Sequence, residues 1–485
     1  MPILTVITWL PIAGLAVIML LPRSRAAWSK WVALAAAGGS LVLSWGLLVG
    51  FDRSSSEQQF TEQTTWIPEL GMTYTLGVDG LSFPMVLLAT LLTVVALIAS
   101  LKVEHNPKAY FAWMMLLEFA ILGVFVARDW FLFYVFWEIA LVPMFFLIGM
   151  WGGPRKERAT LTFFMYTLGG SIFMLLGIFA IYLASDPQTF DMEALKAASE
   201  GWTRSFQILP FAMFFIGFAV KIPVFPLHGW LPLAHVQAPT PVSIMLSGVL
   251  LKLGAYGVLR VADTLPEGLD AFLPVIFVLA LVNILYGAFL AFRQTDLKAI
   301  VAFSSISHMG FVLLGIAALN ATGVSGAVFM MVAHGLVTGG LFLLVGIIYE
   351  RTRTMELGQL AGLSGQVPVY TGITVLALLA SMGLPGLAQF VGEFQTLLGA
   401  YERWGLFVLF ASLGILVTAT FTLRVIAAMF TGELDERWKG VRDLDGRELA
   451  AAVPLAILTV ALGIFPSLVL GLTDTTIRAM TALDA

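Results

Sequence analysis

The stretch FAVKIPVFPLHGWLP, residues 218–232, places a lysine inside an apolar run and follows it with prolines at 223 and 226. The thirteen residues before Lys221, ILPFAMFFIGFAV, carry no charge. An apolar helix of about 20 residues crosses a bilayer. Proline interrupts a helix because it lacks a backbone N–H. The stretch therefore predicts a membrane helix that carries a buried charge and breaks beside it.

The rest of the chain has the same apolar character. Of its 485 residues, 59% are hydrophobic and 12% are charged, whereas a soluble domain carries about 25% charged residues. We predict an all-α integral membrane protein, because apolar runs long enough to cross a bilayer as helices recur throughout the chain. The fourteen expected helices lie at roughly 3–22, 31–51, 80–101, 109–127, 130–151, 160–184, 207–229, 241–262, 270–292, 299–319, 324–349, 367–399, 405–430 and 449–472.

The distribution of lysine and arginine predicts the orientation, because cytoplasmic loops are enriched in both residues. If the loop after the first helix is cytoplasmic, sixteen lysines and arginines, among them Lys298, fall in cytoplasmic loops. Seven, among them Arg128 and Arg260, fall in segments on the other side. We therefore expect both termini on the periplasmic side. A miscount of two helices would leave this result unchanged.

Several classes of chemistry are excluded. The chain has no cysteine, which excludes disulfides and cysteine-ligated iron–sulfur clusters. It has no basic tract for nucleic acid, no phosphate-binding glycine loop and no metal-ligand spacing. We expect no cofactor and no metal in this chain, so that any linked redox reaction takes place in another subunit.

A few ionisable residues remain at membrane depth once the loop charges are set aside. A charge at the centre of a bilayer costs about 2.5–3.5 kcal/mol, so such residues usually face the bundle interior and mark an ion or proton path. The alternatives to a functional role are a neutral, hydrogen-bonded carboxyl group or a lysine whose ammonium group reaches the membrane interface. For Glu118 and the two histidines, packing explains the residue nearly as well as function does. The set is Glu118, Glu138, Lys221, Lys252, His308, His334 and Glu393.

A duplicated architecture is indicated by two proline-containing breaks. If helices 4–8 and 9–13 form two five-helix blocks, the fourth member of each is interrupted, by Pro223 and Pro226 in KIPVFP and by Pro385 in SMGLPG. Paired broken helices point to internal repeats with an ion site at the midplane. Because each block has five helices, an odd number, the second block is expected to run across the membrane in the direction opposite to the first. The expected parts of the single membrane domain are 1–104 (helices 1–3), 105–262 (first repeat), 263–432 (inverted repeat) and 433–485 (loop and helix 14).

Three long stretches resemble a known family: FWEIALVPMFFLIGMWGG (136–153), FAVKIPVFPLHGWLPLAHVQAPTPVSIMLSGVLLKLGAYGVLR (218–260) and QTDLKAIVAFSSISHMGFVLLG (294–315). They are similar to the antiporter-like membrane subunits of respiratory complex I, the proton-pumping NADH:quinone oxidoreductase. The similarity runs from GVDGLS (77–82) to helix 13. A glutamate on the second broken helix and the end of the chain soon after helix 14 favour the M, or chain 4, branch.

The resemblance implies a role for each buried residue. Glu138 and Lys221 would form the ion pair of a first half-channel, Lys252 would be the central relay, and Glu393 would end a second half-channel. His308 and His334 would bridge Lys252 to Glu393, and Glu118 is a further relay candidate. Two further histidines, His228 and His235, would lie near a cytoplasmic entry.

The resemblance also implies the surroundings of the chain. Flavin, iron–sulfur clusters and quinone would belong to partner subunits, with NADH or ferredoxin as the electron donor. The partners would be antiporter-like neighbours on both sides, the peripheral redox arm and the lipid of a bacterial cytoplasmic membrane.

Two other functions are considered. A subunit of an Mrp-type cation/proton antiporter would share the buried charges and the broken helices, but Glu393 argues against it. A purely structural membrane subunit would leave the matched charges and breaks unexplained.

The segment GLAQF (386–390) departs from the turn that relatives usually have before the glutamate, which puts the geometry of that break in doubt.

Overall fold

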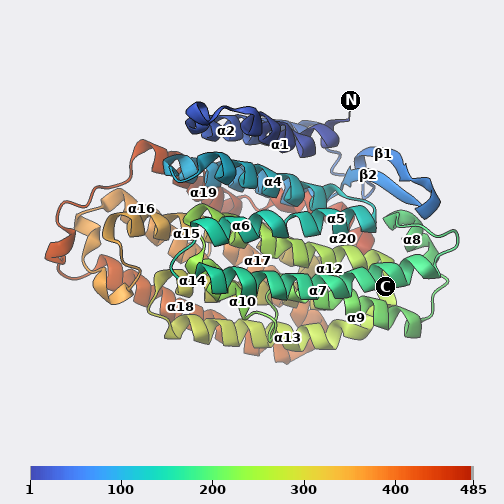
Figure 1. Cartoon of the computed structure of the whole chain (residues 1–485). Coiled ribbons are helices and arrows are strands. Elements are labelled where there is room, and N and C mark those ends of the chain that lie inside the picture. Colours follow the sequence, from blue (N-terminus) through green and yellow to red (C-terminus); the bar gives the residue numbers. More distant parts are fainter. Residues whose placement is uncertain (1, 482–485) are drawn as a thin grey trace.

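A computed structural model describes residues 2–481 as a bundle of long helices that run side by side (Figure 1). The first half contains α1 (Ile3–Leu20), α2 (Ser29–Gly46), β1 (Gln59–Ile67), β2 (Met72–Val78), α3 (Phe83–Ala99), α4 (Pro107–Val126), α5 (Trp130–Ile139), α6 (Leu141–Trp151), α7 (Lys156–Ala184), α8 (Met192–Ser199), α9 (Arg204–Lys221), α10 (Trp230–Gln237), α11 (Thr240–Met245) and α12 (Leu251–Thr264). The second half contains α13 (Pro266–Arg293), α14 (Leu297–Ala318), α15 (Ala321–Thr352), α16 (Pro368–Ser381), α17 (Ala388–Trp404), α18 (Leu409–Phe430), α19 (Gly446–Ile464) and α20 (Ser467–Thr481).

The predicted all-α membrane fold is confirmed. Within residues 2–481, thirteen helical segments are long and apolar enough to cross a membrane. The predicted broken helix at 367–399 consists of two shorter helices, α16 and α17, and α17 continues into α18 as one segment of 43 residues, Ala388–Phe430. That length is enough for two crossings. The two crossings are separated at Gly405, where a positive φ of 59° ends α17.

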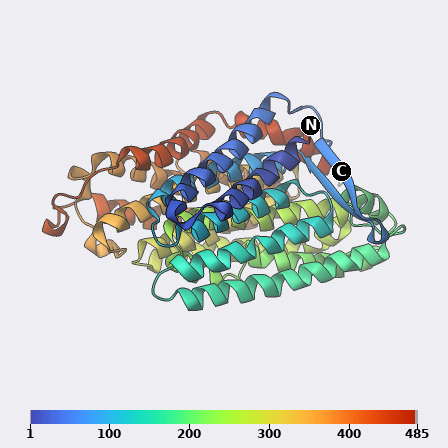
Figure 2. The ribbon, with the colours of Figure 1, turned by 45° about the horizontal axis from the view of Figure 1, so that its top comes forward.

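The loop at 52–79 contains a two-stranded antiparallel sheet that the all-helical prediction missed. Its strands β1 and β2 are rich in threonine and aromatic residues, which favour strands. The sheet lies at one end of the bundle, beside α8 (Figures 1 and 2). Its Glu62 accepts hydrogen bonds from the backbone of Leu4 and Thr5 at 2.7 and 3.0 Å. A carboxylate there satisfies the free N–H groups at the start of α1.

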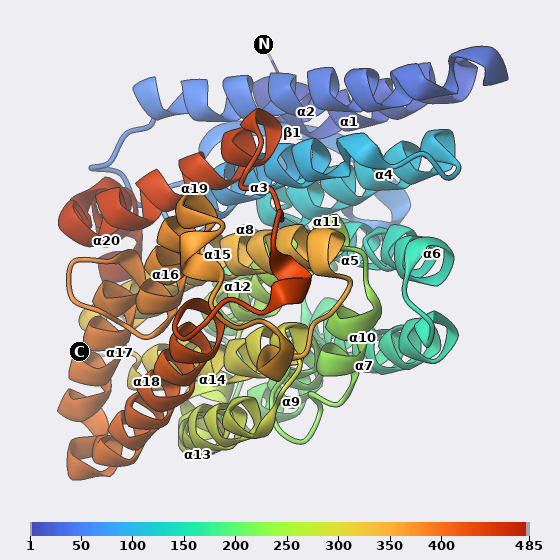
Figure 3. The ribbon, with the colours of Figure 1, turned by 90° about the vertical axis from the view of Figure 1, so that its left-hand side faces the viewer.

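The most deeply buried helices lie in the middle of the bundle. The apolar spans of α15 and of the segment Thr240–Thr264 are entirely buried, and that of α14 is 94% buried. By contrast, only 33% of the α1 span is buried, and the end-on view shows α1 and α2 along one edge (Figure 3). Helices that are apolar and buried on every side are enclosed by protein rather than by lipid. Polar groups on these central helices therefore face other helices.

Both proline-containing stretches interrupt their helices. The first helix ends at Lys221 and resumes as α10 at Trp230, and the second ends at Ser381 and resumes as α17 at Ala388. The chain turns in the same way at each break. Val224 donates its N–H to the carbonyl of Ala219 at 2.8 Å, and Leu384 donates to Leu379 at 3.1 Å, so each bond spans five residues. The inverted repeat that these breaks suggest stays a prediction.

Candidate functional site

Lys252 lies at the centre of the bundle, directly after an irregular turn. Residues Leu246–Leu250 form a π-helical turn between α11 and α12, in which Leu251 donates to the carbonyl of Leu246 five residues back. The Nζ of Lys252 donates to the carbonyl of Ser247 within this turn. Single π-turns inside α-helices occur frequently at functional sites, because the wider turn offers backbone groups to other partners. The turn therefore gives the buried lysine a polar partner on its own helix.

His334, on the neighbouring helix α15, is the second partner of this lysine. Its Nδ1 lies 2.6 Å from the Nζ of Lys252, and both side chains are fully buried. Three hydroxyl groups surround the contact. Ser247 bonds to Thr338 on α15 at 3.2 Å and lies 3.3 Å from the hydroxyl of Ser305 on α14. Three central helices are thus joined by polar side chains around one lysine–histidine contact.

His308, on α14, continues this arrangement. The centroids of its ring and of the His334 ring lie 5.6 Å apart, with the rings inclined at 66°. Both nitrogens of His308 and the Nε2 of His334 are buried and have no hydrogen-bond partner within the described part of the chain. The structure therefore brings Lys252, His334 and His308 together, whereas their role as a bridge to Glu393 stays a prediction.

Glu393, on α17, is held by the second break. Pro385 has no N–H, so it cannot satisfy the carbonyl of Ser381 four residues before it. Gln389 takes this role: its Nε2 donates to the carbonyl of Ser381 and to the Oε1 of Glu393, both at 3.1 Å. Helix α17 packs against α14, which carries His308. Between residues 2 and 481, however, no direct hydrogen bond joins Glu393 to His308.

Lys221 and Glu138 do not form the expected ion pair. No oxygen of Glu138 lies within 4.0 Å of Lys221 among the ion pairs of the described chain. The Nζ of Lys221 instead lies 5.1 Å from the ring centroid of Trp137 and 5.7 Å from that of Phe163, where the aromatic faces attract the cation. The Oε1 of Glu138 is buried without a partner. Glu138 and Lys221 are therefore an open pair, in which no salt bridge joins the carboxyl and ammonium groups within the described residues.

The other candidates are buried but lie outside the central row of contacts. Glu118 on α4 is 1% exposed, and neither of its oxygens has a partner in the described residues. The ring of His235 stacks on that of Phe342, with 4.4 Å between centroids. His228 packs between the rings of Phe225 and Tyr286.

The sequence prediction did not identify two buried polar residues, one at the first break and one at the start of α14. Asn283, fully buried on α13, accepts from the N–H of Phe225 at 2.8 Å and donates to the carbonyl of Pro223 at 3.2 Å, which satisfies the first break. The sequence signal that could have identified Asn283 is a single asparagine inside an apolar helix. Lys298 was assigned to a cytoplasmic loop, but it is buried at the start of α14, where it donates to the carbonyl of Ala238 at 2.6 Å.

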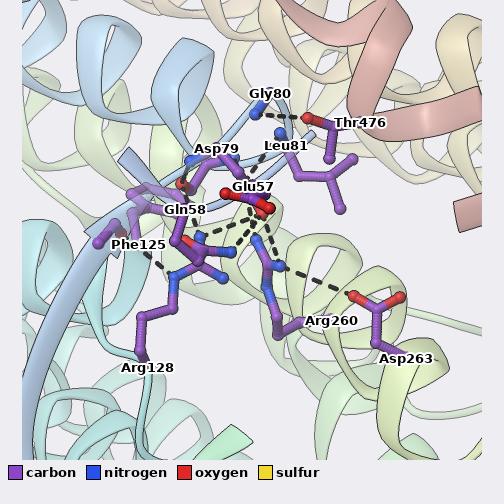
Figure 4. A network of polar contacts seen from close by, with 12 residues as sticks. Glu57, Gln58, Asp79, Gly80, Leu81, Phe125, Arg128, Arg260, Asp263 and Thr476 are labelled. Atoms are coloured by element: carbon purple, nitrogen blue, oxygen red, sulfur yellow. Dashed lines mark hydrogen bonds and ion pairs between the residues drawn. The ribbon is translucent and has the colours of Figure 1, made fainter. Parts of the chain in front are cut away.

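A buried ion cluster at the end of α12 was also missed, because Arg128 and Arg260 were counted as loop charges. Asp79 lies 2.8 Å from Arg260 and 3.1 Å from Arg128, and all three side chains are at most 4% exposed (Figure 4). Burial alone would raise the pKa of Asp79, but the two guanidinium groups outweigh burial and hold it well below 3.8. The cluster joins the loop before α3 to the helix that carries Lys252.

Metal chemistry has no support in the described residues. Within residues 2–481, no group of three or more histidine, cysteine, aspartate or glutamate side chains is placed to hold a metal ion. The lysine, histidine and glutamate side chains in the bundle interior can accept and donate protons.

Comparison with known proteins gives consistent matches over the whole chain. The family described as "NADH:quinone oxidoreductase/Mrp antiporter, TM" matches residues 127–420. NADH-quinone oxidoreductase subunit M of Rhodobacter capsulatus is 41% identical over 482 residues, which cover 96% of this chain and 94% of the relative. A chain of respiratory complex I from Thermus thermophilus with bound NADH superposes with a TM-score of 0.91 at 32% identity, covering 100% of both chains. A chain of the Mrp complex from Dietzia sp. superposes with a TM-score of 0.87 at 22% identity, covering 100% of this chain and 98% of that one, which shows a shared fold alone.

Proposed function

Because this chain belongs to the NADH:quinone oxidoreductase/Mrp antiporter transmembrane family, we propose that it translocates protons as a membrane subunit of a respiratory NADH:quinone oxidoreductase. The named relative in Rhodobacter capsulatus, which matches over nearly its whole length, supports this function. Electron transfer would take place on flavin, iron–sulfur clusters and quinone in partner subunits. The chain would lie between antiporter-like neighbours in a bacterial cytoplasmic membrane, with both termini on the periplasmic side.

The contact between Lys252 and His334 is the observation that carries the proposal. A charged lysine donates to the free Nδ1 of a neutral histidine, and a protonated Nδ1 donates equally well to a neutral lysine. At 2.6 Å, the proton can change sides without movement of either nitrogen. The hydrogen bond that Lys252 donates to the carbonyl of Ser247 keeps the amine in place during this exchange. The pair can therefore pass a proton along α12 and α15 without a cofactor.

The other buried residues extend this step to a path. Glu138 and Lys221 would bring protons into the first half of the path. If the two side chains of this open pair came into contact, the charged form of both groups would be favoured. His308 would continue from His334 toward Glu393, which ends the path on α17. His228 and His235 would serve the entry, and Glu118 would be a further relay group. The inverted repeats at 105–262 and 263–432 would place the two breaks on either side of Lys252.

An Mrp-type antiporter subunit is the other function that shares this fold. The Mrp likeness is 22% identical and carries no functional argument, whereas the complex I chain is 32% identical over the full length of both chains. The two functions differ in coupling. A complex I subunit pumps protons only while NADH is oxidised, whereas an antiporter subunit exchanges cations without electron transfer.

Substitution of the central lysine tests the proposal. The variant Lys252→Met keeps the length of the side chain and removes its proton-carrying group. In inverted membrane vesicles that contain the assembled complex, we expect NADH-driven acidification to fall at least about tenfold, because positioned proton-transfer groups contribute roughly 10²–10⁴-fold. Lys439→Met is the matched control, since Lys439 is exposed in a loop and pairs only with Glu436. Normal acidification by an assembled Lys252→Met complex would disprove the proposed role.

A further inference from the structure

An apolar cavity of about 220 Å³ lies on the flank of the bundle, and none of the proposed proton-transfer residues lines it. Leu87, Leu88 and Leu91 of α3 line it together with Leu336 of α15. Residues of α2, α19 and α20 complete its walls, and Figure 3 shows these three helices near one edge of the molecule. Four of the five contributing helices belong to segments that are apolar and long enough to cross a membrane. The cavity therefore lies at the depth of the hydrocarbon layer.

The contents of such a cavity are restricted by its lining. Apolar cavities exclude water, and a cavity of about 150 Å³ lined by leucine, isoleucine and phenylalanine binds benzene rather than water. The larger cavity here has room for several methylene groups of an alkyl chain. Its shape is maintained at one wall by Trp45, whose indole N–H donates to the carbonyl of Leu87 at 3.2 Å and ties α2 to α3.

Arg53 is the one charged residue that lines the cavity. Its carbonyl accepts a hydrogen bond from Thr475 at 2.6 Å, which holds this segment against α20. The guanidinium group lies beside Gly471, where an added Cβ would be 3.8 Å from Nη1. Within residues 2–481, the guanidinium forms neither an ion pair nor a hydrogen bond to another side chain. Arg53 follows the end of α2 by only a few residues, which places it near the membrane surface.

We propose that the cavity binds one acyl chain of an anionic phospholipid and that Arg53 binds its phosphate. An alkyl chain matches the leucine lining, and the planar guanidinium group matches two phosphate oxygens. The spacing also fits, because the charge lies where the headgroups lie and the cavity lies in the hydrocarbon layer. A bound lipid would fill the space between α2 and the C-terminal helices. An apolar side chain from a neighbouring subunit is the competing occupant.

Photolabelling in native membranes tests the proposal without relying on proton pumping. Membranes that contain the full chain are loaded with phosphatidylglycerol that carries a diazirine on its acyl chain, then irradiated, and the labelled peptides are identified by mass spectrometry. We expect label on the peptides that contain Leu87–Leu91 and Leu468–Leu472. Absence of label there, with label present elsewhere on the chain, would mean that protein covers the cavity and would overturn the proposal.

Two variants separate the headgroup from the chain. Arg53→Gln should lower labelling of these peptides by phosphatidylglycerol about tenfold, which corresponds to about 1.4 kcal/mol, because the charge-assisted hydrogen bonds to the phosphate are lost. Labelling by a diacylglycerol with the same diazirine serves as the reference, because this lipid has the acyl chain but no phosphate. Leu48→Trp, which fills the cavity from its half-buried rim, should lower labelling by both lipids.

Arg478→Gln is the matched control for the headgroup, because Arg478 is exposed in the last turn of α20, the helix that holds the backbone of Arg53, but pairs with Asp474. Its labelling should equal that of the unchanged chain. Equal labelling of Arg53→Gln and Arg478→Gln would overturn the assignment of Arg53. Undiminished labelling of Leu48→Trp would overturn the assignment of the cavity.

Discussion

The Nζ of Lys252 and the Nδ1 of His334 lie 2.6 Å apart, and both side chains are fully buried. A lysine in this position has one neutral partner in the histidine and another in the carbonyl of Ser247. In the described part of the chain, no carboxylate lies within 4.0 Å of it, so no fixed counter-charge holds the proton on the lysine. Proton exchange between the two nitrogens is therefore the chemistry that this contact favours.

Replacing the histidine should stop transfer at this step. In assembled complexes that carry His334→Ala, we expect NADH-driven proton pumping to fall at least about tenfold, because the positioned acceptor is lost. The measurement is acidification of inverted vesicles per NADH oxidised. His105→Ala is the control, since His105 lies in an exposed loop. Equal pumping in both variants would remove His334 from the path.

Asp79 should be essential for stability rather than for transfer. Asp79→Asn removes the carboxylate that pairs with buried Arg128 and leaves buried Arg260 only its longer contact of 3.8 Å to Asp263, which costs about 3–5 kcal/mol. We expect a lower unfolding temperature of the purified chain or reduced assembly in membranes. Asp474→Asn removes an exposed pair with Arg478 and should cost less than about 1 kcal/mol. A fully stable Asp79→Asn chain would contradict the role of the cluster.

The same aspartate predicts how stability depends on pH. The pKa of Asp79 in the folded chain lies well below its ordinary value of 3.8, so the folded state binds its proton less tightly than the unfolded state does. Its contribution to the free energy of unfolding is therefore present above pH 3.8 and is lost as the pH falls further, through the folded pKa. Thermal unfolding between pH 6 and about pH 3 measures this. The difference in unfolding temperature between Asp79→Asn and the unchanged chain should shrink below pH 3.8.

Gln389 should position Glu393. In Gln389→Leu, the carbonyl of Ser381 and one oxygen of Glu393 lose their donor, which costs about 1–3 kcal/mol for buried polar groups. We expect a lower unfolding temperature together with a shifted pH dependence of proton pumping, because the environment of the carboxyl group changes. Gln359→Leu, at an exposed position, is the control. A loss of stability with an unshifted pH profile would restrict Gln389 to a structural role.

Much of the fold follows directly from local sequence. Runs of about 20 apolar residues have to form helices in a bilayer, since unsatisfied backbone groups are costly there. The breaks at Lys221 and Ser381 follow from prolines, because Pro223 and Pro385 lack the N–H that a continuous helix needs. The buried lysine and glutamate candidates could be found in the same way, because a charge is conspicuous in an apolar run.

The strands in the loop at 52–79 could not be found by this reasoning, because their pairing depends on contacts between segments. The residues that pair with the buried charged side chains could not be predicted from the sequence for the same reason. Arg128 and Arg260 have the appearance of loop residues until the fold brings both against Asp79, which is 181 residues from Arg260 in the chain.

The sequence by itself determined that this protein is a helical membrane protein with buried ionisable groups and two broken helices. Only the tertiary structure decided which of these groups touch. Lys252 and His334 are 82 residues apart in the chain, and a π-turn at Ser247 with close packing of three helices brings them into contact. The open pair of Glu138 and Lys221 was likewise a matter of packing, because aromatic rings occupy the space around the ammonium group. Helix formation depends on neighbours in the chain, whereas a proton path depends on distances of a few ångströms between helices.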